Sequence, residues 1–161
     1  MKKTLVFALL IVLGLSVLFT GCGGNAPKSR PANTNNTPKV VKGKTNETVT
    51  LPGDTSLTVQ RVLRNPEDKN MILVRVLIKN IGKMPQVYQI GNFYLLDNSS
   101  GKTISPALLK VPDPIITTNV LPGKTLSGYL GFNVGKGKGK FTLVFQGATG
   151  NIEINIPNVE N

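Results

Sequence analysis

Apolar side chains at every second position are the feature of this sequence that most restricts its fold. The runs 72–78, 141–145 and 152–156 all show this alternation. Because successive side chains of a β-strand point to opposite faces, such runs predict strands with one buried face. Turn-forming residues separate the runs, and no stretch of a dozen residues has apolar positions at helical spacing. Residues 48–157 therefore predict an all-β domain, a β-sandwich of about seven or eight antiparallel strands, with a short C-terminal tail at 158–161.

The first 21 residues have the pattern of a secretory signal peptide. Lys2 and Lys3 give a positive start, and a nearly unbroken apolar run follows from Leu5 to Phe19. A helix over residues 4–20 would be about 25 Å long, whereas the hydrocarbon core of a bilayer is about 30 Å thick. A cleaved signal at 1–21 is therefore favoured, and an uncleaved membrane anchor is the alternative.

The only cysteine of the chain, Cys22, comes directly after this run. The segment 18–22, Leu-Phe-Thr-Gly-Cys, resembles the bacterial lipobox, with Phe19 where an aliphatic residue is usual. The resemblance implies that Cys22 becomes the mature N-terminus and carries a diacylglycerol and an acyl chain such as palmitate. Such a lipid would hold the protein at the extracytoplasmic face of the cell membrane, since each buried methylene contributes about 0.8 kcal/mol. An ordinary buried thiol is the alternative.

Residues 22–47 predict a flexible linker between the lipid and the folded domain. Asn, Thr, Pro, Lys and Gly dominate their composition, and Val40-Val41 is their only apolar pair. Five basic residues of this segment are accompanied by one carboxylate, that of Glu47. A solvated linker and a polyanion-binding segment both fit this composition.

The chain as a whole is strongly basic, with 19 Lys and Arg against 8 Asp and Glu and a formal net charge of +11. Removal of a signal that contains Lys2 and Lys3 lowers the net charge to +9. Such an excess suits an anionic lipid surface, an anionic wall polymer or simple solubility. Nucleic acid is disfavoured as a partner, because the chain is predicted to be exported and no run interleaves arginines with aromatic residues.

Histidine is absent from the sequence, which removes the commonest general base and every Ser-His or Cys-His nucleophile pair. The carboxylates Asp54, Asp97 and Asp113 are next to turn residues, where side chains usually hydrogen-bond nearby backbone groups. The segment 97–101 lacks the alternating ligands and flanking helices of an EF-hand calcium loop. The sequence therefore predicts no enzyme, no metal site and no cofactor, with carboxylate catalysis through Asp97 or Asp113 as the alternative.

Three segments are candidates for contact with a partner. A Gly-Lys repeat suits lipid or wall phosphates, with a mobile hairpin tip as the alternative. The strand at 71–79 turns apolar side chains and one arginine away from the predicted core, unless another segment covers them. The connection at 105–120 is long and rich in proline, as recognition loops often are. The residues concerned are Lys136, Lys138 and Lys140 in the repeat, Leu73, Arg75 and Leu77 on the strand, and Pro112, Asp113 and Pro114 in the connection.

Three longer segments resemble one bacterial family over residues 48–157. They are LVRVLIKNIGKMP from Leu73, FYLLDNSSGK from Phe93 and LPGKTLSGYLGFNV from Leu121. Together they resemble the telokin-like, immunoglobulin-fold domain of unknown function that many exported bacterial lipoproteins carry. A related exported family with a Phe-x-Leu-Tyr-Asp signature is a near match at 93–97. Both resemblances imply an extracytoplasmic immunoglobulin-like sandwich, and neither supplies a catalytic residue.

Together these features predict a membrane-anchored extracytoplasmic lipoprotein that acts as a non-enzymatic binding module. Its ligand is not specified by the sequence, although an unknown protein, an anionic lipid or a wall polymer would suit its charge. The alternative function is that of an exported protease inhibitor that uses the 105–120 loop.

Overall fold

The computed structural model describes residues 38–161 except 137–138, 157–158 and 160–161. The predicted signal peptide, Cys22, most of the predicted linker and Lys138 lie outside the described residues. No helix within the described part is long and apolar enough to cross a membrane. The described residues form eleven strands and one 3-10 turn: β1 Lys39–Lys44, β2 Thr48–Leu51, β3 Thr55–Arg64, β4 Met71–Asn80, β5 Gln86–Tyr88, η1 Ile90–Asn92, β6 Phe93–Asp97, β7 Thr103–Ile104, β8 Thr118–Val120, β9 Thr125–Asn133, β10 Phe141–Gln146 and β11 Gly150–Ile156.

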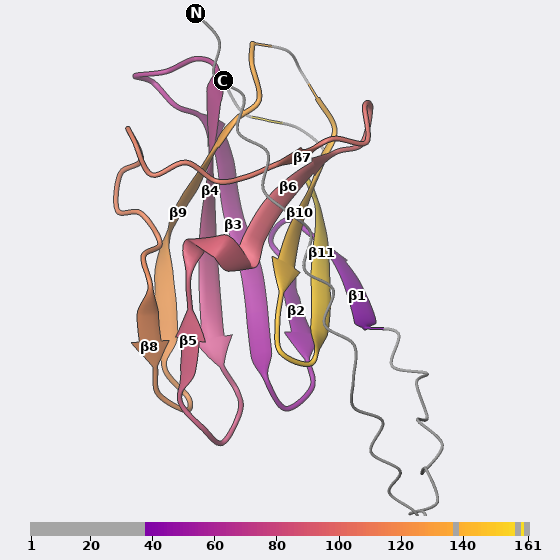
Figure 1. The fold of residues 1–161 in the computed structure, drawn as a ribbon, viewed down its shortest axis with the longest axis vertical. Helices are drawn as coiled ribbons and strands as arrows, with labels where there is room; N and C mark the ends of the chain where they lie inside the picture. Colours follow the sequence, from indigo (N-terminus) through magenta and orange to yellow (C-terminus); the bar gives the residue numbers. More distant parts are fainter. Residues whose placement is uncertain (1–37, 137–138, 157–158, 160–161) are drawn as a thin grey trace, which may run out of the picture. The chain divides into compact units, whose positions relative to one another are not determined.

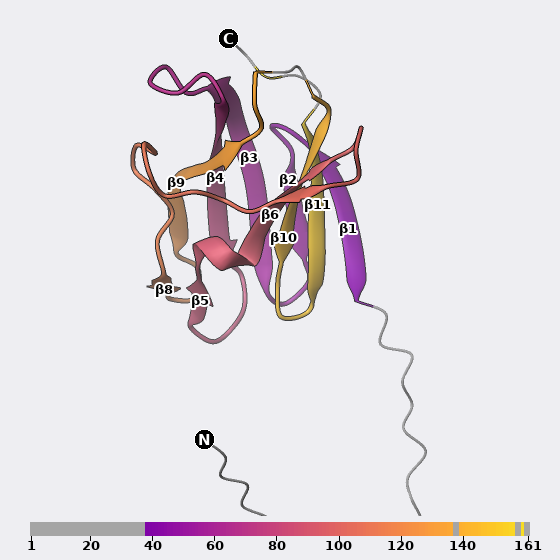
Figure 2. The same cartoon turned by 45° about the horizontal axis from the view of Figure 1, so that its top comes forward.

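Two sheets pack face to face in this part of the chain (Figure 1). Strands β1, β11, β10, β6 and β7 form one sheet in that order, and β2, β3, β4 and β9 form the other. The short strands β5 and β8 make a separate two-stranded ribbon. A tilted view shows the two layers, with β8 beside β9 (Figure 2). The predicted all-β sandwich is confirmed.

The core lies between the two sheets and is made by the alternating side chains. The side chains at 72, 74, 76 and 78 of β4 are fully buried, as are those at 152, 154 and 156 of β11. Phe93 and Phe145 pack against each other with ring centroids 5.1 Å apart. Burial of one such large apolar side chain contributes roughly 1.5–3 kcal/mol, so this two-sided core is the main source of stability.

The N-terminal boundary of the domain differs from the prediction, because the predicted linker does not extend to residue 47. Residues 39–44 form β1, which pairs in parallel with β11 from Lys39 beside Gly150 to Lys44 beside Asn155. Val41 packs against the core, whereas the lysines of the strand are exposed. The sequence of β1 therefore shows no alternation, because only Val41 packs on the core. The partner strand of β1, β11, is more than a hundred residues away in the sequence.

The structure also has more strands than the predicted seven or eight. The strands β5, β7 and β8 have only two or three residues each, which is too short for a readable alternation. The β1–β11 pair is parallel, while the other strand pairs of the described residues are antiparallel.

The connection between β7 and β8 runs along the edge of β9. The amide of Ala107 donates to the carbonyl of Gly131 at 2.8 Å, and the amide of Ile115 donates to the carbonyl of Tyr129 at 3.0 Å. Between these two ties, the side chain of Val111 lies so close to Gly131 that a Cβ atom there would collide with it. The connection thus protects an edge strand that would otherwise present unpaired backbone groups.

The position of this connection also contradicts part of the predicted partner surface on β4. Leu73 is paired with Gly131 in the sheet, and its side chain is only 2% exposed. The prediction of a free apolar stripe is therefore wrong at Leu73, because the chain covers this part of the sheet with its own connection. Arg75 remains exposed and lies over the ring of Tyr129, while Leu77 is half-buried.

The two ends of the sandwich carry different turns. We call the end at which β1 begins the proximal end, and it is the lower end in Figure 1. The distal end lies about 33 Å away, which is the length of the ten-residue β4 at about 3.3 Å per residue. The proximal turns are 52–54, 81–85, 121–124 and 147–149, and the distal turns are 45–47, 65–70, 98–102 and the described part of 134–140.

Val41→Asp tests whether β1 contributes to the folded domain. Val41 is half-buried against the core, so a carboxylate at this position should lower the free energy of unfolding by about 1–2 kcal/mol. Val40→Asp is the matched control, because Val40 is 45% exposed and should change the stability by less than about 0.5 kcal/mol. Urea denaturation measures both variants. Equal stability of the two would contradict the packing of β1 on the core.

Candidate functional site

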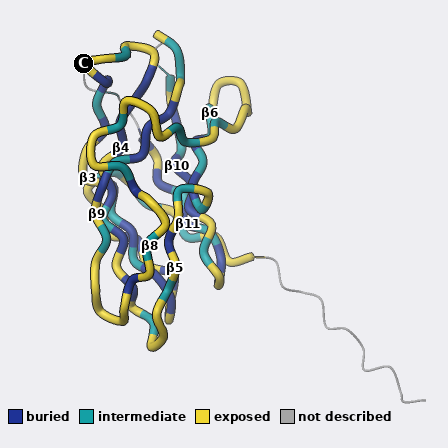
Figure 3. The backbone as a smooth tube through the Cα atoms, turned by 60° about the vertical axis from the view of Figure 1, so that its left-hand side comes forward, coloured by how far each residue is buried: buried dark blue, intermediate teal, exposed yellow. Residues whose placement is uncertain are grey.

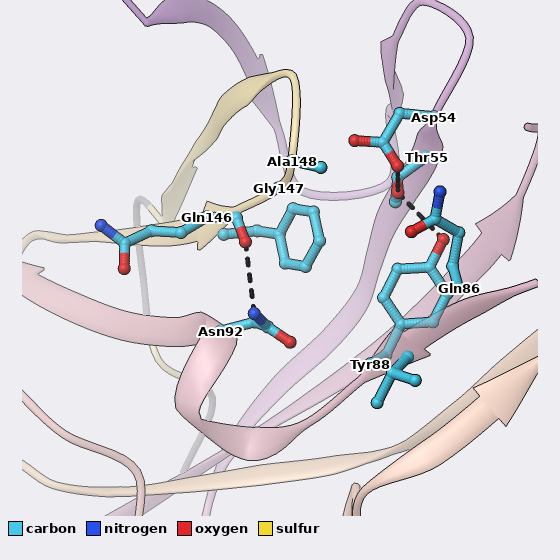
Figure 4. A pocket seen from close by; sticks show the side chains of 10 residues that line it. Asp54, Thr55, Gln86, Tyr88, Asn92, Gln146, Gly147 and Ala148 are labelled. Carbon is cyan, nitrogen blue, oxygen red and sulfur yellow. Dashed lines mark hydrogen bonds between the residues drawn. The ribbon is translucent and has the colours of Figure 1, made fainter.

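A polar pocket of about 290 Å³ opens at the proximal end (Figure 4). Its wall comes from the turn between β2 and β3, from β5 and η1, and from the end of β10 with its turn to β11. The pocket therefore brings together segments that are up to about ninety residues apart in the sequence. Its polar lining side chains are those of Asp54, Thr55, Gln86, Tyr88, Asn92 and Gln146.

Asp54, Thr55 and Tyr88 form a buried chain of hydrogen bonds at this pocket. The hydroxyl of Thr55 donates to Asp54 Oδ1 at 3.0 Å and lies 2.9 Å from the hydroxyl of Tyr88. Since a carboxylate only accepts, Tyr88 is left to donate to Thr55. The second carboxylate oxygen, Oδ2, accepts from the amide and the hydroxyl of Thr149 at 3.3 and 3.2 Å. All buried side-chain nitrogen and oxygen atoms of the described residues have a hydrogen-bond partner.

Burial raises the pKa of Tyr88 above the usual value, because a phenolate in this place would lose its hydration. The hydrogen bond to Thr55 acts in the opposite direction, and the nearby charge of Asp54 raises the pKa further. The hydroxyl of Tyr88 is consequently a protonated donor at neutral pH, as the hydrogen-bonded chain requires.

A second buried polar side chain, Asn80, fastens the turns next to the pocket. Its Nδ2 donates to the carbonyls of Met84 and Val120, both at 2.8 Å, and its Oδ1 accepts from the amide of Gly82 at 2.9 Å. The backbone carbonyl of Asp54 accepts from the same Gly82 amide at 3.1 Å. The rim of the pocket is therefore held by side chains on regular strands, which favours a pre-formed site.

The free hydrogen-bonding groups of the pocket are neutral. Both oxygens of Asp54 are occupied by donors within the protein, whereas the side-chain amide of Gln86 has no hydrogen bond. The amide of Gln146 points away from the other residues of the pocket (Figure 4). An amide side chain can donate to and accept from a ligand at the same time. Within the part of the chain that the structure describes, no group of three or more His, Cys, Asp and Glu residues could hold a metal ion.

Residues 41–154 match the model of the family described as Domain of unknown function (DUF4352). The chain belongs to this family. The matched region begins within β1 and ends within β11, so it includes most of the strand that the sequence assigned to the linker. Among curated proteins no sequence matches this DUF4352 chain.

Solved structures with low sequence identity share the fold of this DUF4352 domain. The ycdA protein of Bacillus subtilis, a proposed lipoprotein, is 17% identical with a TM-score of 0.58 over 71% of this chain and 38% of its own. The secreted protein MPT63 of Mycobacterium tuberculosis is 12% identical with a TM-score of 0.57 over 74% of this chain and 98% of its own. The yjhA protein of B. subtilis is 24% identical with a TM-score of 0.53 over 64% and 79% of the two chains. The chain spans little more than a third of the ycdA structure.

The residues predicted to contact a partner lie away from the pocket. Leu73 and Pro112 line one cavity of about 360 Å³ together with residues of the distal 65–70 turn. Pro114 forms a β-bridge with Tyr129, the residue whose ring lies under Arg75 at 5.6 Å from its centroid. The structure thus joins parts of the two predicted surfaces, on the β4–β9 side of the sandwich.

The remaining predicted contact residues are on turns. Lys136 and Lys140 are both exposed, in the connection between β9 and β10 at the distal end. Lys138 lies outside the described residues. Asp113 is exposed at a backbone φ of 42°, and its carbonyl accepts from the amide of Tyr129 at 2.9 Å.

The predicted turn role of Asp97 is confirmed. Its carboxylate accepts from the hydroxyl of Ser100 at 2.7 Å and from the amide of Ser99 at 2.9 Å. The bond from Ser100, followed by that from Ser99, lowers the pKa of Asp97. This carboxylate therefore stabilises its own hairpin turn.

Sequence reasoning missed the pocket because its members come from unrelated motifs. Asp54 was predicted only as a turn residue, and Gln86 and Tyr88 lie on a strand of three residues. One signal was present, since the turns Leu-Pro-Gly-Asp-Thr at 51–55 and Leu-Pro-Gly-Lys-Thr at 121–125 differ only in the fourth residue. In the first of these two turns, the fourth residue is Asp54, and its side chain points inward to the pocket.

Tyr88→Phe tests the raised pKa of the pocket phenol. Because the folded-state pKa of Tyr88 is raised, the unfolded chain ionises first once the pH exceeds about 10. The stability that the protonated phenol contributes is complete below that pH and is lost as the pH rises through the folded-state pKa. The free energy of unfolding of Tyr88→Phe should therefore fall less steeply above about pH 10 than that of the wild type.

Urea denaturation at a series of alkaline pH values measures this slope. Tyr94→Phe is the matched control, because it removes a phenol from β6 outside the hydrogen-bonded chain. A slope for Tyr88→Phe that equals the wild-type slope would contradict the buried, protonated state of Tyr88.

Proposed function

We propose that this chain is a lipid-anchored, non-enzymatic binding domain on the extracytoplasmic face of a bacterial membrane. The apolar run before Cys22 and the lipobox-like residues around it support export and lipidation. Similarity in fold to a proposed lipoprotein and to a secreted protein supports the same setting. The domain would be of the telokin-like, immunoglobulin-fold type that its sequence resembles.

The observation that supports the binding role is the pocket at Asp54, in which the side-chain amide of Gln86 has no hydrogen bond within the protein and can bind a ligand. Its volume of about 290 Å³ is at the lower limit of the roughly 300–1,000 Å³ of ligand pockets, so it suits one side chain rather than a cofactor. Gln86 offers a neutral donor and acceptor, and both oxygens of Asp54 already accept hydrogen bonds within the protein. The ligand is a peptide amide or amide side chain of an envelope protein.

The basic charge of the chain supports an additional contact with anionic polymers. Lys136 and Lys140 lie at the distal end, which in an anchored chain faces away from the lipid. Wall polymers are the anions available on that side, and binding to them would be weak and sensitive to salt. Nucleic acid is no partner in this setting.

Cys22→Ser tests the lipid anchor. In a bacterial host that processes lipoproteins, the wild-type chain should sediment with membranes, incorporate palmitate and have an intact mass that corresponds to an acylated chain starting at Cys22. The Cys22→Ser chain should lose the palmitate label and leave the membrane fraction, because the domain alone lacks the acyl chains. An unacylated wild-type chain that retains Met1 would contradict the anchor.

The 105–120 connection supports a second candidate function, that of an exported protease inhibitor. Leu108 and Leu109 are 52% and 81% exposed, on a stretch whose ends are tied to β9 through Ala107 and Ile115. An exposed apolar loop held at both ends loses little conformational entropy when it binds, which is what an inhibitory loop requires.

A photo-crosslinking amino acid at residue 86 or at residue 109 discriminates the two functions. In intact cells the probe at 86 should capture an envelope protein, and the probe at 109 should capture none, because the pocket is the proposed binding site. The same probe at the exposed distal residue 136 controls for random contact. Capture of an active-site-labelled protease at 109, with none at 86, would favour the inhibitor and contradict the pocket.

A further inference from the structure

The proximal end carries an unusual group of exposed apolar side chains. Of the eight large apolar residues that are exposed in the described part of the chain, four lie on the β5–β8 ribbon and the turns next to it. Met84 is 69% exposed, Val87 59%, Leu121 54% and Ile81 37%. A tube view from another side shows the β5–β8 ribbon at the surface (Figure 3). These side chains are not part of the protein core. A cluster of exposed apolar side chains of this kind indicates an interaction surface.

These apolar side chains belong to one surface. Asn80 holds the carbonyls of Met84 and Val120 together, so the 81–85 and 121–124 turns are neighbours. Val87 is paired with Asn119 in the β5–β8 ribbon. Since alternate residues share a face of a β-ribbon, Leu121 continues the outward side on which Val87 lies. We call Met84, Val87 and Leu121 the apolar tip.

The exposed charged side chains around the apolar tip are all positive. Lys79, Lys83 and Lys124 are exposed on the strands and turns that carry it. The carboxylate of the proximal turns, that of Asp54, is buried and fully hydrogen-bonded. The described carboxylates of the distal turns differ, because they lie at the surface: Glu47, Glu67, Asp68 and Asp97. The proximal surface therefore combines apolar groups with uncompensated positive charge.

The position of the incoming chain brings this surface close to the predicted lipid. Cys22 is 16 residues before Pro38, and Pro38 and Lys39 line a cavity with the proximal 147–149 turn. Sixteen residues span at most about 55 Å when fully extended. A coil of the predicted composition spans about 22 Å on average, which is less than the length of about 33 Å of β4. A lipid on Cys22 would therefore keep the proximal end nearer to the bilayer than the distal end.

We propose that the proximal end docks on the surface of an anionic lipid bilayer. Met84, Val87 and Leu121 enter the headgroup region, while Lys83 and Lys124 contact lipid phosphates. Apolar insertion and basic charge are the two contributions that strengthen attachment beyond a lipid chain alone. The orientation rests on the proposed lipid anchor, but the affinity of this surface for an anionic bilayer does not.

A fluorescent probe at residue 87 tests the docking. Because Cys22 is the only cysteine, an acylated Val87→Cys chain has a single free thiol for an environment-sensitive dye. In vesicles of brominated phosphatidylglycerol and phosphatidylcholine, this dye should shift to shorter wavelength and be quenched at least threefold. Leu109→Cys is the matched control, since Leu109 is 81% exposed next to Lys110, which is paired with the distal residue Asp68. Its dye should remain in water.

A second arm separates docking from lipidation. The Cys22→Ser, Val87→Cys chain, added to the same vesicles at low salt, should also show quenching. Quenching in this arm together with an unacylated wild-type chain would support docking and refute the anchor. Equal exposure of the probes at 87 and 109 in acylated chains would refute docking and leave the anchor intact. A spectral shift that needs no lipid and grows with protein concentration would also refute docking, since it would indicate a second copy.

Charge variants of the unacylated chain test the role of the lysines. Lys83→Gln with Lys124→Gln should weaken partitioning onto phosphatidylglycerol vesicles about 30-fold, the loss expected from two lysines near an anionic surface. Lys102→Gln with Lys136→Gln removes the same charge from exposed distal positions and should change partitioning less than threefold. Equal losses in the two double variants would refute a specific docking surface.

Discussion

The hydrogen bonds of one buried carboxylate hold the proximal end of this protein together. Asp54 lies in the turn between β2 and β3, yet its side chain reaches Thr149 in the hairpin of the other sheet. Its backbone carbonyl accepts from Ile81 and Gly82 in a third turn. A buried carboxylate without such donors would strongly destabilise the fold. The pocket and the exposed turns around it depend on this arrangement.

Much of the fold could be predicted from the sequence, because its central strands are long and have apolar side chains at every second position. The core-facing side chains of β4 and β11 recur with a period of two, which is visible without any structure. β1 could not be predicted, since Val41 alone packs on the core and parallel pairing leaves no local pattern. The same holds for Leu73, whose cover comes from a connection without regular structure.

The candidate site was less predictable than the fold for a related reason. A turn carboxylate is normally bound to its own turn, and Asp97 follows that rule with Ser99 and Ser100. Asp54 breaks it, because its partners are Thr149 and the neighbouring Thr55. Which carboxylate turns inward depends on the packing of two sheets, and a single sequence contains no record of that packing. The local sequence therefore predicted correctly that Asp54 lies at a turn. It did not predict that the side chain of Asp54 points into the pocket.

The arrangement of the two ends links the pocket to the proposed membrane surface. Val87 is part of the apolar tip and also lines the pocket, next to Gln86. Gln86 and Val87 point to opposite faces of β5, so a partner bound at Gln86 would lie close to a bilayer docked at Val87 without competing for the same side chain. This geometry favours a segment of a membrane protein close to the lipid surface over a freely diffusing ligand.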